Sequence, residues 1–135
     1  MRTLGQQRAQ FCLEQLENLA CDRKDFKPFS AGLPAMILQN GFGQTLAFLA
    51  AKGSKENKMT KQIEFIHDNK HYVAFTIIVI WLIQNNLFQA GSEKDILLQI
   101  STMDQKKYLR AQQETLAMLE WLKRYANAAL FMEEK

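Results

Sequence analysis

The side chains that could do chemistry are few in this chain, and the two histidines are the first to consider. His67 and His71 would share one face of a helix, which is the spacing of some zinc ligands. A zinc site needs further protein ligands, and a zinc peptidase of this pattern also needs a glutamate directly after its first histidine, where this chain has Asp68. We therefore expect two surface histidines and no metal site.

Two glycines, Gly41 and Gly43, look like part of a nucleotide-binding loop. The dinucleotide-binding pattern requires a third glycine three residues further on, where the chain has Leu46, and the Gly-Lys-Ser/Thr of the P-loop is absent. We expect instead a tight corner between two helices, and no cofactor. In this interpretation the N–H groups that open the second helix can still take a phosphate oxygen.

The remaining nucleophiles and carboxylates form no catalytic pattern. Cys12 and Cys21 do not make a C-x-x-C pair, and we expect two reduced thiols. Glu114 follows Arg110 by one helical turn, so we expect a surface ion pair there. Three pairs of glutamates lie in hydrophilic surroundings rather than in the apolar pockets that general acids need: Glu14 and Glu17, Glu114 and Glu120, and Glu133 and Glu134. We predict no catalytic residue and a protein that is not an enzyme.

Length and composition indicate one globular domain, residues 1–135. Of the 135 residues 47% are hydrophobic and 23% charged, which is enough apolar material for a single core. The net charge of +3 permits binding to nucleic acid or to an acidic partner without requiring either. The first part of the chain lacks the apolar segment of a signal peptide, and no apolar run is long enough to cross a membrane. We therefore expect a cytoplasmic protein without membrane contact.

The clearest local structure is a helical hairpin over residues 30–52. Ser30 is expected to cap its first helix, and Pro34 suits a first helical turn, whereas Pro28 should end any helix before it. Residues that tolerate positive φ or keep bulk out of a corner separate the two helices. These corner residues, to which we assign a packing or interface role, are Asn40, Gly41, Gly43 and Gln44.

The apolar run after the hairpin is the hardest segment to assign. From Val73 to Ile80 it is rich in β-branched residues, which suits a buried strand. No second segment offers a strand partner, however, and an isolated strand leaves its backbone polar groups unpaired. We therefore predict a helix over residues 72–88 that is apolar on every side, as in the centre of a bundle. The polar residues 53–60 before it indicate either a solvated loop or one that contacts phosphate.

A long periodic segment predicts a C-terminal helix over residues 103–132, with Thr102 and Gln105 as a capping box. One stripe of this helix carries Tyr108, Thr115, Leu119, Leu122, Ala126 and Leu130. The opposite side carries Lys106, Arg110 and Arg124, with Trp121 beside them. Trp121 is therefore core if this side is covered by other helices, and an interface residue if it is not.

A further capping box, Ser92 with Asp95, opens a shorter helix before the last one. Together these segments predict an all-α fold, a single compact bundle of about six helices.

Two blocks of this sequence resemble one protein family. The first block is Leu33-Pro34, Asn40-Gly41-Phe42-Gly43-Gln44 and Leu46-Ala47-Phe48-Leu49. The second is Tyr108, Arg110, Glu114 and Glu120-Trp121-Leu122-Lys123-Arg124-Tyr125-Ala126. In residues, order and approximate separation they are similar to the small subunit of the type III-B CRISPR effector, the Cmr complex.

The resemblance implies a small, non-catalytic helical subunit that serves antiviral defence. Such subunits stack along a filament of larger backbone subunits, beside the CRISPR RNA and its target RNA. The implied partners are the other Cmr subunits, above all the backbone subunit, further copies of this chain, and both RNAs. The candidate RNA-contacting residues are basic: Lys52, Lys55, Lys58, Lys61, Lys106, Lys107, Arg110 and Arg124. A helical adaptor that binds only protein is the alternative.

Overall fold

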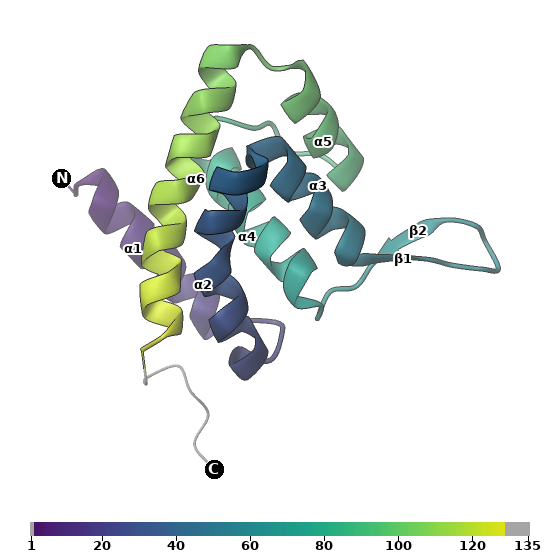
Figure 1. The fold of residues 1–135 in the computed structure, drawn as a ribbon, viewed down its shortest axis with the longest axis horizontal. Coiled ribbons are helices and arrows are strands. Elements are labelled where there is room, and N and C mark those ends of the chain that lie inside the picture. The colour runs from purple at the N-terminus through teal and green to yellow at the C-terminus, as the bar shows by residue number, and fades with distance from the viewer. Residues whose placement is uncertain (1, 129–135) are drawn as a thin grey trace.

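The computed structural model describes residues 2–128, and helices make up most of this part of the chain (Figure 1). The predicted helical bundle is confirmed. The two strands form one small antiparallel sheet. The elements in chain order are α1 (Leu4–Glu17), α2 (Arg23–Asn40), α3 (Phe42–Lys52), β1 (Ser54–Glu56), β2 (Ile63–Phe65), α4 (Lys70–Gln84), α5 (Glu93–Thr102) and α6 (Gln105–Ala126).

Helix α6 is the element against which much of the bundle assembles. It packs along both α1 and α2, while α4 packs against α3 and α6. Its apolar stripe is buried as predicted at Thr115, Leu119, Leu122 and Ala126, while Leu130 lies outside the described residues. The fold is therefore held by the periodic stripe of its longest helix.

Helix α4 forms the centre of the bundle, as predicted from its uniformly apolar sequence. Asn69 caps it, because its side-chain oxygen accepts from the N–H groups of His71 and Tyr72. The helix is apolar around most of its circumference, with buried residues Val73, Ala74, Phe75, Ile77, Ile78, Val79, Trp81 and Leu82. It ends at Gln84, before the predicted limit, although Leu87 and Phe88 still enter the core from the turn that follows.

Helix α2 begins earlier than the sequence indicated. Asp22 is its cap and accepts from the Lys24 N–H at 2.7 Å. Ser30, the predicted cap, is buried inside the helix, where its hydroxyl donates to the Lys27 carbonyl at 3.0 Å. The predicted start of the hairpin at residue 30 is therefore wrong, because the helix already begins at Arg23.

Both prolines lie inside α2, against expectation. An interior proline costs a helix about 3 kcal/mol, because it removes a hydrogen bond and crowds the preceding turn. Burying a large apolar side chain contributes about 1.5–3 kcal/mol, so one packed face can offset this cost. That face consists of Phe26, Leu33, Pro34 and Ile37, all buried. Pro28 therefore does not end a helix here, and Pro34 is not in a first turn.

The corner between α2 and α3 is a single residue, Gly41, with φ 90° and ψ 159°. The positive φ that we expected is confirmed, although this ψ is one that glycine alone adopts readily. Asn40 remains the last residue of α2 and does not itself turn the chain. The corner therefore depends on Gly41 having no side chain.

The segment between α3 and α4 is a β-hairpin, which the sequence analysis missed. Strands β1 and β2 pair antiparallel with Lys55 opposite Glu64, and Figure 1 shows the hairpin projecting from the helical body. At the turn, Asn57 accepts through its side chain from the N–H groups of Met59 and Thr60. The segment over residues 53–60, which we predicted to be a loop, therefore forms the first half of a β-hairpin. Strands β1 and β2 satisfy each other's backbone hydrogen bonds.

The last two helices differ from prediction only at their ends. The Ser92–Asp95 capping box of α5 is confirmed. Helix α6 is capped by Asp104, which accepts from the Lys107 N–H at 2.8 Å, and not by Thr102, whose hydroxyl donates to the Leu98 carbonyl. The described part of α6 ends at Ala126 with Asn127 as its C-cap. Of the predicted extension to residue 132, residues 129–132 lie outside the described residues.

Candidate nucleic-acid interface

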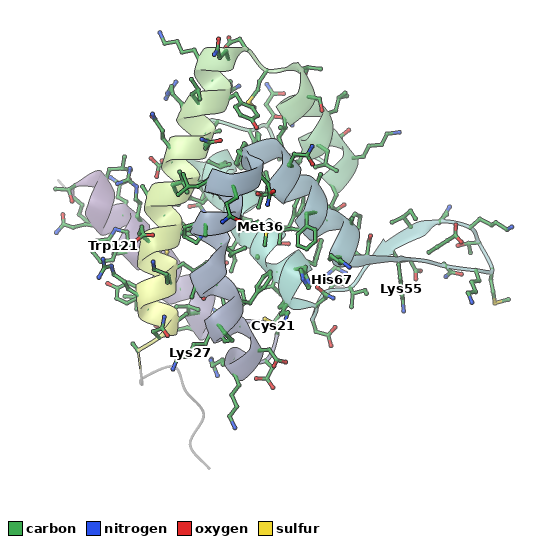
Figure 2. The ribbon with its side chains drawn as sticks, in the orientation of Figure 1. Cys21, Lys27, Met36, Lys55, His67 and Trp121 are labelled. Atoms are coloured by element: carbon green, nitrogen blue, oxygen red, sulfur yellow. The ribbon has the colours of Figure 1, made fainter. Side chains whose placement is uncertain are left out.

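The first cluster of predicted RNA-contacting residues lies on the projecting hairpin, which we call the arm (residues 52–65). Lys55 is in β1 and its side chain lies on this projection (Figure 2). Lys58 and Lys61 are in the turn, and Lys52 is the last residue of α3 where the arm begins. All four lysines are exposed, and none forms an ion pair with another described residue. The structure therefore brings these four predicted residues together on one projecting element.

The arm also carries groups that are not basic. Glu56 and Glu64 oppose the four lysines, so the arm is positive overall. Glu64 accepts a hydrogen bond from the Asn57 amide at 3.1 Å rather than pairing with Lys55 across the strands. Met59 and Ile63 are 94% and 61% exposed, which is unusual for large apolar side chains. The arm therefore offers hydrated cations together with some apolar surface to an external partner.

The second predicted cluster lies on α6. Lys106, Arg110 and Arg124 are exposed, whereas Lys107 is half-buried. The arm and α6 lie on opposite sides of the view in Figure 1, so the two clusters do not form one surface. Each cluster must therefore be tested separately for contact with a nucleic acid.

Trp121 lies on the side of the body near α1 and α6 (Figure 2). It is half-buried, packs against the core and places its ring 5.7 Å from that of Tyr125. It is neither a fully buried core residue nor an isolated surface aromatic. The helical pattern had placed Trp121 beside the basic residues of α6, at the edge of that cluster.

At the corner, side chains of α6 accept hydrogen bonds from the first N–H groups of α3. The Gly43 N–H donates to the Tyr108 hydroxyl at 2.9 Å, and the Phe42 N–H donates to the Gln112 side chain at 3.3 Å. A Cβ on Gly43 would stand 3.2 Å from Ile100 and 3.3 Å from the Tyr108 hydroxyl. These two N–H groups are thus already bonded within the protein and are not free to take a phosphate oxygen.

Glu114 does not pair with Arg110 but closes a cluster between three helices. Arg8 of α1 donates to both of its carboxylate oxygens, at 2.6 and 2.8 Å, and the Trp81 indole of α4 donates at 2.9 Å. Burial alone would raise the pKa of Glu114, but the hydrogen bonds from Arg8 and Trp81 outweigh it and hold the pKa below its ordinary value. The expected exposed Arg110–Glu114 pair is wrong because Arg8 reaches the same carboxylate from another helix.

The two histidines do not share a helical face. His67 lies in the turn before α4 and contacts the Tyr72 ring, while His71 is in the first turn and contacts Phe29 and Phe48. Burial, and then the nearby Lys70 and Lys52, lower the pKa of His71. Within residues 2–128 no group of three metal-ligating side chains comes together. The arrangement gives neither histidine the partners of a metal site.

The cysteines and the remaining glutamate pairs are the other candidate reactive groups named from the sequence. Both thiols are free, and burial raises the pKa of Cys12 to about 12 and that of Cys21 to about 11. Glu14 and Glu17 are exposed on α1, and Glu120 pairs with Lys123 at 3.4 Å. Glu133 and Glu134 lie outside the described residues. Glu14 and Glu17 are therefore solvated, and Glu120 takes part in an exposed ion pair.

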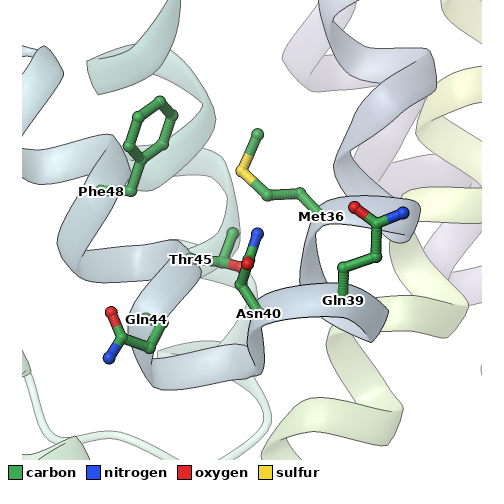
Figure 3. Close-up of a pocket in the computed structure, with 6 residues that line it drawn as sticks. All are labelled: Met36, Gln39, Asn40, Gln44, Thr45 and Phe48. Carbon is green, nitrogen blue, oxygen red and sulfur yellow. The ribbon is translucent and has the colours of Figure 1, made fainter.

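A pocket of about 540 Å³ lies between the end of α2 and the exposed side of α3, and we call it the corner pocket. Figure 3 shows Phe48 and Met36 on two sides of it, with Asn40 and Thr45 between them. The Thr45 hydroxyl is buried and has no hydrogen-bond partner in the described part of the chain. Of its lining residues, Asn40 and Gln44 were predicted from the sequence to belong to the corner, whereas Met36, Gln39, Thr45 and Phe48 were not.

These features define a small helical fold with a lysine-bearing β-arm, and its described residues bring together no group of three metal-ligating side chains. None of the described helices combines the length and apolar character needed to cross a bilayer. The sequence matches the family described as CRISPR-associated protein (Cas_Cmr5) over residues 4–129, so this chain belongs to that family.

Two relatives have similar length and sequence. The "CRISPR system Cmr subunit Cmr5" of Thermus thermophilus is 27% identical over 132 residues, covering 96% of this chain and 98% of the relative. The protein of the same description from Thermotoga maritima is 29% identical over 137 residues, covering 99% of this chain and 90% of the relative. The resemblance drawn from two sequence blocks therefore extends over nearly the whole chain.

Proposed function

We propose that this chain is a non-catalytic small subunit of a CRISPR Cmr complex that stacks along the backbone filament and contacts guide or target RNA through its arm. Membership in the Cas_Cmr5 family supports the assignment to the complex. The observation that supports RNA contact is the exposure of Lys52, Lys55, Lys58 and Lys61 on one projecting element without internal ion partners.

The size of this electrostatic contribution is modest for one copy. A subunit that neutralises ~2–4 phosphates of a single strand gives a slope of log affinity against log salt of about −1.4 to −2.8. Binding by one free chain is therefore weak and indifferent to sequence. Several copies stacked on one RNA act together, and the linked contacts raise the overall affinity without any new contact.

The proposal is tested by reversing charge in the reassembled complex. One variant changes the arm lysines to glutamate, and a second changes Lys106, Arg110 and Arg124. Target-RNA affinity is then measured across a salt series. We expect the arm variant to weaken binding and to flatten the salt slope by about 0.7 per lost phosphate contact, with assembly unchanged. The α6 variant shows whether the second cluster also lines the RNA.

An adaptor that binds only protein remains the second candidate, and the exposed Met59 and Ile63 on the arm favour it. If neither charge-reversal variant changes affinity or salt slope while the complex still assembles, RNA contact is wrong and this candidate stands.

The non-catalytic part of the proposal has its own test. We expect the purified protein not to cleave RNA, with or without divalent metal ions. Cleavage that disappears when one of this chain's own residues is changed would contradict it.

A further inference from the structure

The corner pocket has the chemistry of a site for a flat, uncharged and polar ring. Its volume of about 540 Å³ lies within the ~300–1,000 Å³ typical of small-molecule sites. None of its lining residues is charged. An ionised carboxylate or ammonium group would lose water there without gaining a counter-ion, which disfavours such a ligand.

Three carboxamides at this pocket have no partner inside the protein. Gln39, Asn40 and Gln44 are exposed and make no side-chain hydrogen bond within residues 2–128. Each carboxamide offers two N–H donors and one oxygen acceptor. That combination pairs with the edges of nucleobases, as asparagine and glutamine do with adenine. The three carboxamides are therefore free to hydrogen-bond to a ligand, and their donors and acceptors match those of a nucleobase edge.

The apolar part of the pocket provides a stacking surface. Phe48 is 40% exposed. Its ring packs against the ring of His71 in an edge-on arrangement, with 5.8 Å between the two ring centroids. Met36 lies on the other side of the pocket (Figure 3). Single-stranded nucleic acids bind largely by stacking unpaired bases on such aromatic side chains.

The pocket and the start of the arm lie along the same side of α3. Gln44, Phe48 and Lys52 follow one another at four-residue intervals on α3, so they lie along one side of this helix. Lys52 is the last residue of α3 and the first residue of the arm. A strand whose base entered the pocket would therefore have a cation one helical turn beyond Phe48, with the other arm lysines further along.

We propose that the corner pocket binds an unpaired nucleobase of a single-stranded RNA, with Phe48 stacking on the base and Asn40 and Gln44 bonding to its edge. This inference rests on the proposed RNA contact and adds a second, uncharged component to it. The arm lysines would contact phosphates, and that contribution to affinity depends on salt. The uncharged pocket would add affinity that depends on the presence of a base and not on salt.

The test separates bases from phosphates by using two ligands with the same backbone. The full-length chain, alone and in the reassembled complex, is titrated with a decamer of uridylates and with the fully abasic decamer. We expect the uridylate decamer to bind at least about 5-fold more tightly, the lower end of the effect of one base-stacking aromatic side chain. Both ligands should show the same salt slope.

Variants then assign the base preference to the pocket. Phe48→Ala and, separately, the exposed Gln44→Ala should each reduce the preference for the uridylate decamer. Leu98→Ala is the matched control, since Leu98 is a large apolar residue of α5 that is 60% exposed and does not line the pocket. Circular dichroism checks that each variant is folded, and Gln44→Ala still tests the pocket if Phe48→Ala unfolds.

The possible failures point to different proposals. Equal binding of both decamers with a clear salt slope overturns the base pocket and leaves the RNA-contacting arm intact. A preference that survives both pocket variants also overturns it, and loss of assembly in those variants would then assign the pocket to a protein partner. Absence of binding to either decamer, by the chain and by the complex, overturns both the pocket and the arm.

Discussion

The arm and the Arg8–Glu114–Trp81 cluster use charge in opposite ways. On the arm, four lysines are exposed and have no ion partner among the described residues. In the cluster, Arg8 and Glu114 are joined by two hydrogen bonds, and the Trp81 indole donates to the same carboxylate. Charges on the arm stay hydrated and available to another molecule, whereas the charges of the cluster are used inside the fold to join α1, α4 and α6.

The largest effect should come from breaking the cluster. Arg8→Met places an apolar side chain at this position and leaves the Glu114 side chain, of which only 12% is exposed, without its cation. We expect a loss of about 2–3 kcal/mol in the free energy of unfolding, measured by urea denaturation at neutral pH.

The matched control for this prediction is Lys123→Met, which breaks the exposed pair with Glu120. Its effect should stay below about 0.5 kcal/mol. Equal losses in the two variants would contradict the distinction between a charge used by the fold and a solvated one.

A change at the corner should be the next largest. Gly41→Val forces a β-branched residue into φ 90° and ψ 159°, which only glycine adopts readily. We expect the variant to lose more than ~1 kcal/mol, seen as a lower melting temperature. An unchanged melting temperature would show that the corner can relax and that Gly41 is not required.

The cluster should also make the stability of the fold depend on pH. The pKa of Glu114 lies below its unfolded value, so its carboxylate stabilises the folded state above the unfolded pKa of about 4.3. This contribution is lost as the pH falls through the folded pKa. The stability difference between the wild type and Glu114→Gln should therefore narrow from pH 6 towards pH 3. A difference that stays constant over this range would argue against an ionised Glu114.

The smallest effect on stability should come from the arm itself. Lys55→Gln with Lys58→Gln removes two exposed charges that have no internal partner, so the free energy of unfolding should stay within about 0.5 kcal/mol of the wild type. Affinity of the reassembled complex for target RNA should nevertheless fall. A large loss of stability would mean that these lysines serve the fold and would remove the contrast with the cluster.

The sequence was most informative where one helix carries its own signal. The uniformly apolar run of α4, the stripe of α6 and the Ser92–Asp95 box of α5 each predicted an element that the structure contains. Each of these patterns lies within a single helix, so residues close together in the sequence are sufficient to reveal it. The same holds for the positive φ of Gly41, because a corner between two helices leaves few residue types to choose from.

The sequence misled where distant residues outweigh local preference. Pro28 suggests a break, but the buried face of α2 carries the helix through it. Polar residues 53–60 suggest a loop, but residues 63–65 supply the hydrogen-bonding partner that makes a strand of part of it. In each case the deciding contact lies elsewhere in the chain than the local signal.

The helical class, the central and C-terminal helices, the corner glycine and the family could all be predicted from the order of the residues. The tertiary structure, in contrast, sets the bonding of Glu114 to Arg8, the bonding of Tyr108 and Gln112 to the N-terminus of α3, and the position of four lysines on one projecting arm. It also formed the corner pocket between α2 and α3. The physical reason is that spacing along a helix fixes which residues share its face, while the partner of that face is fixed only when separate elements pack together.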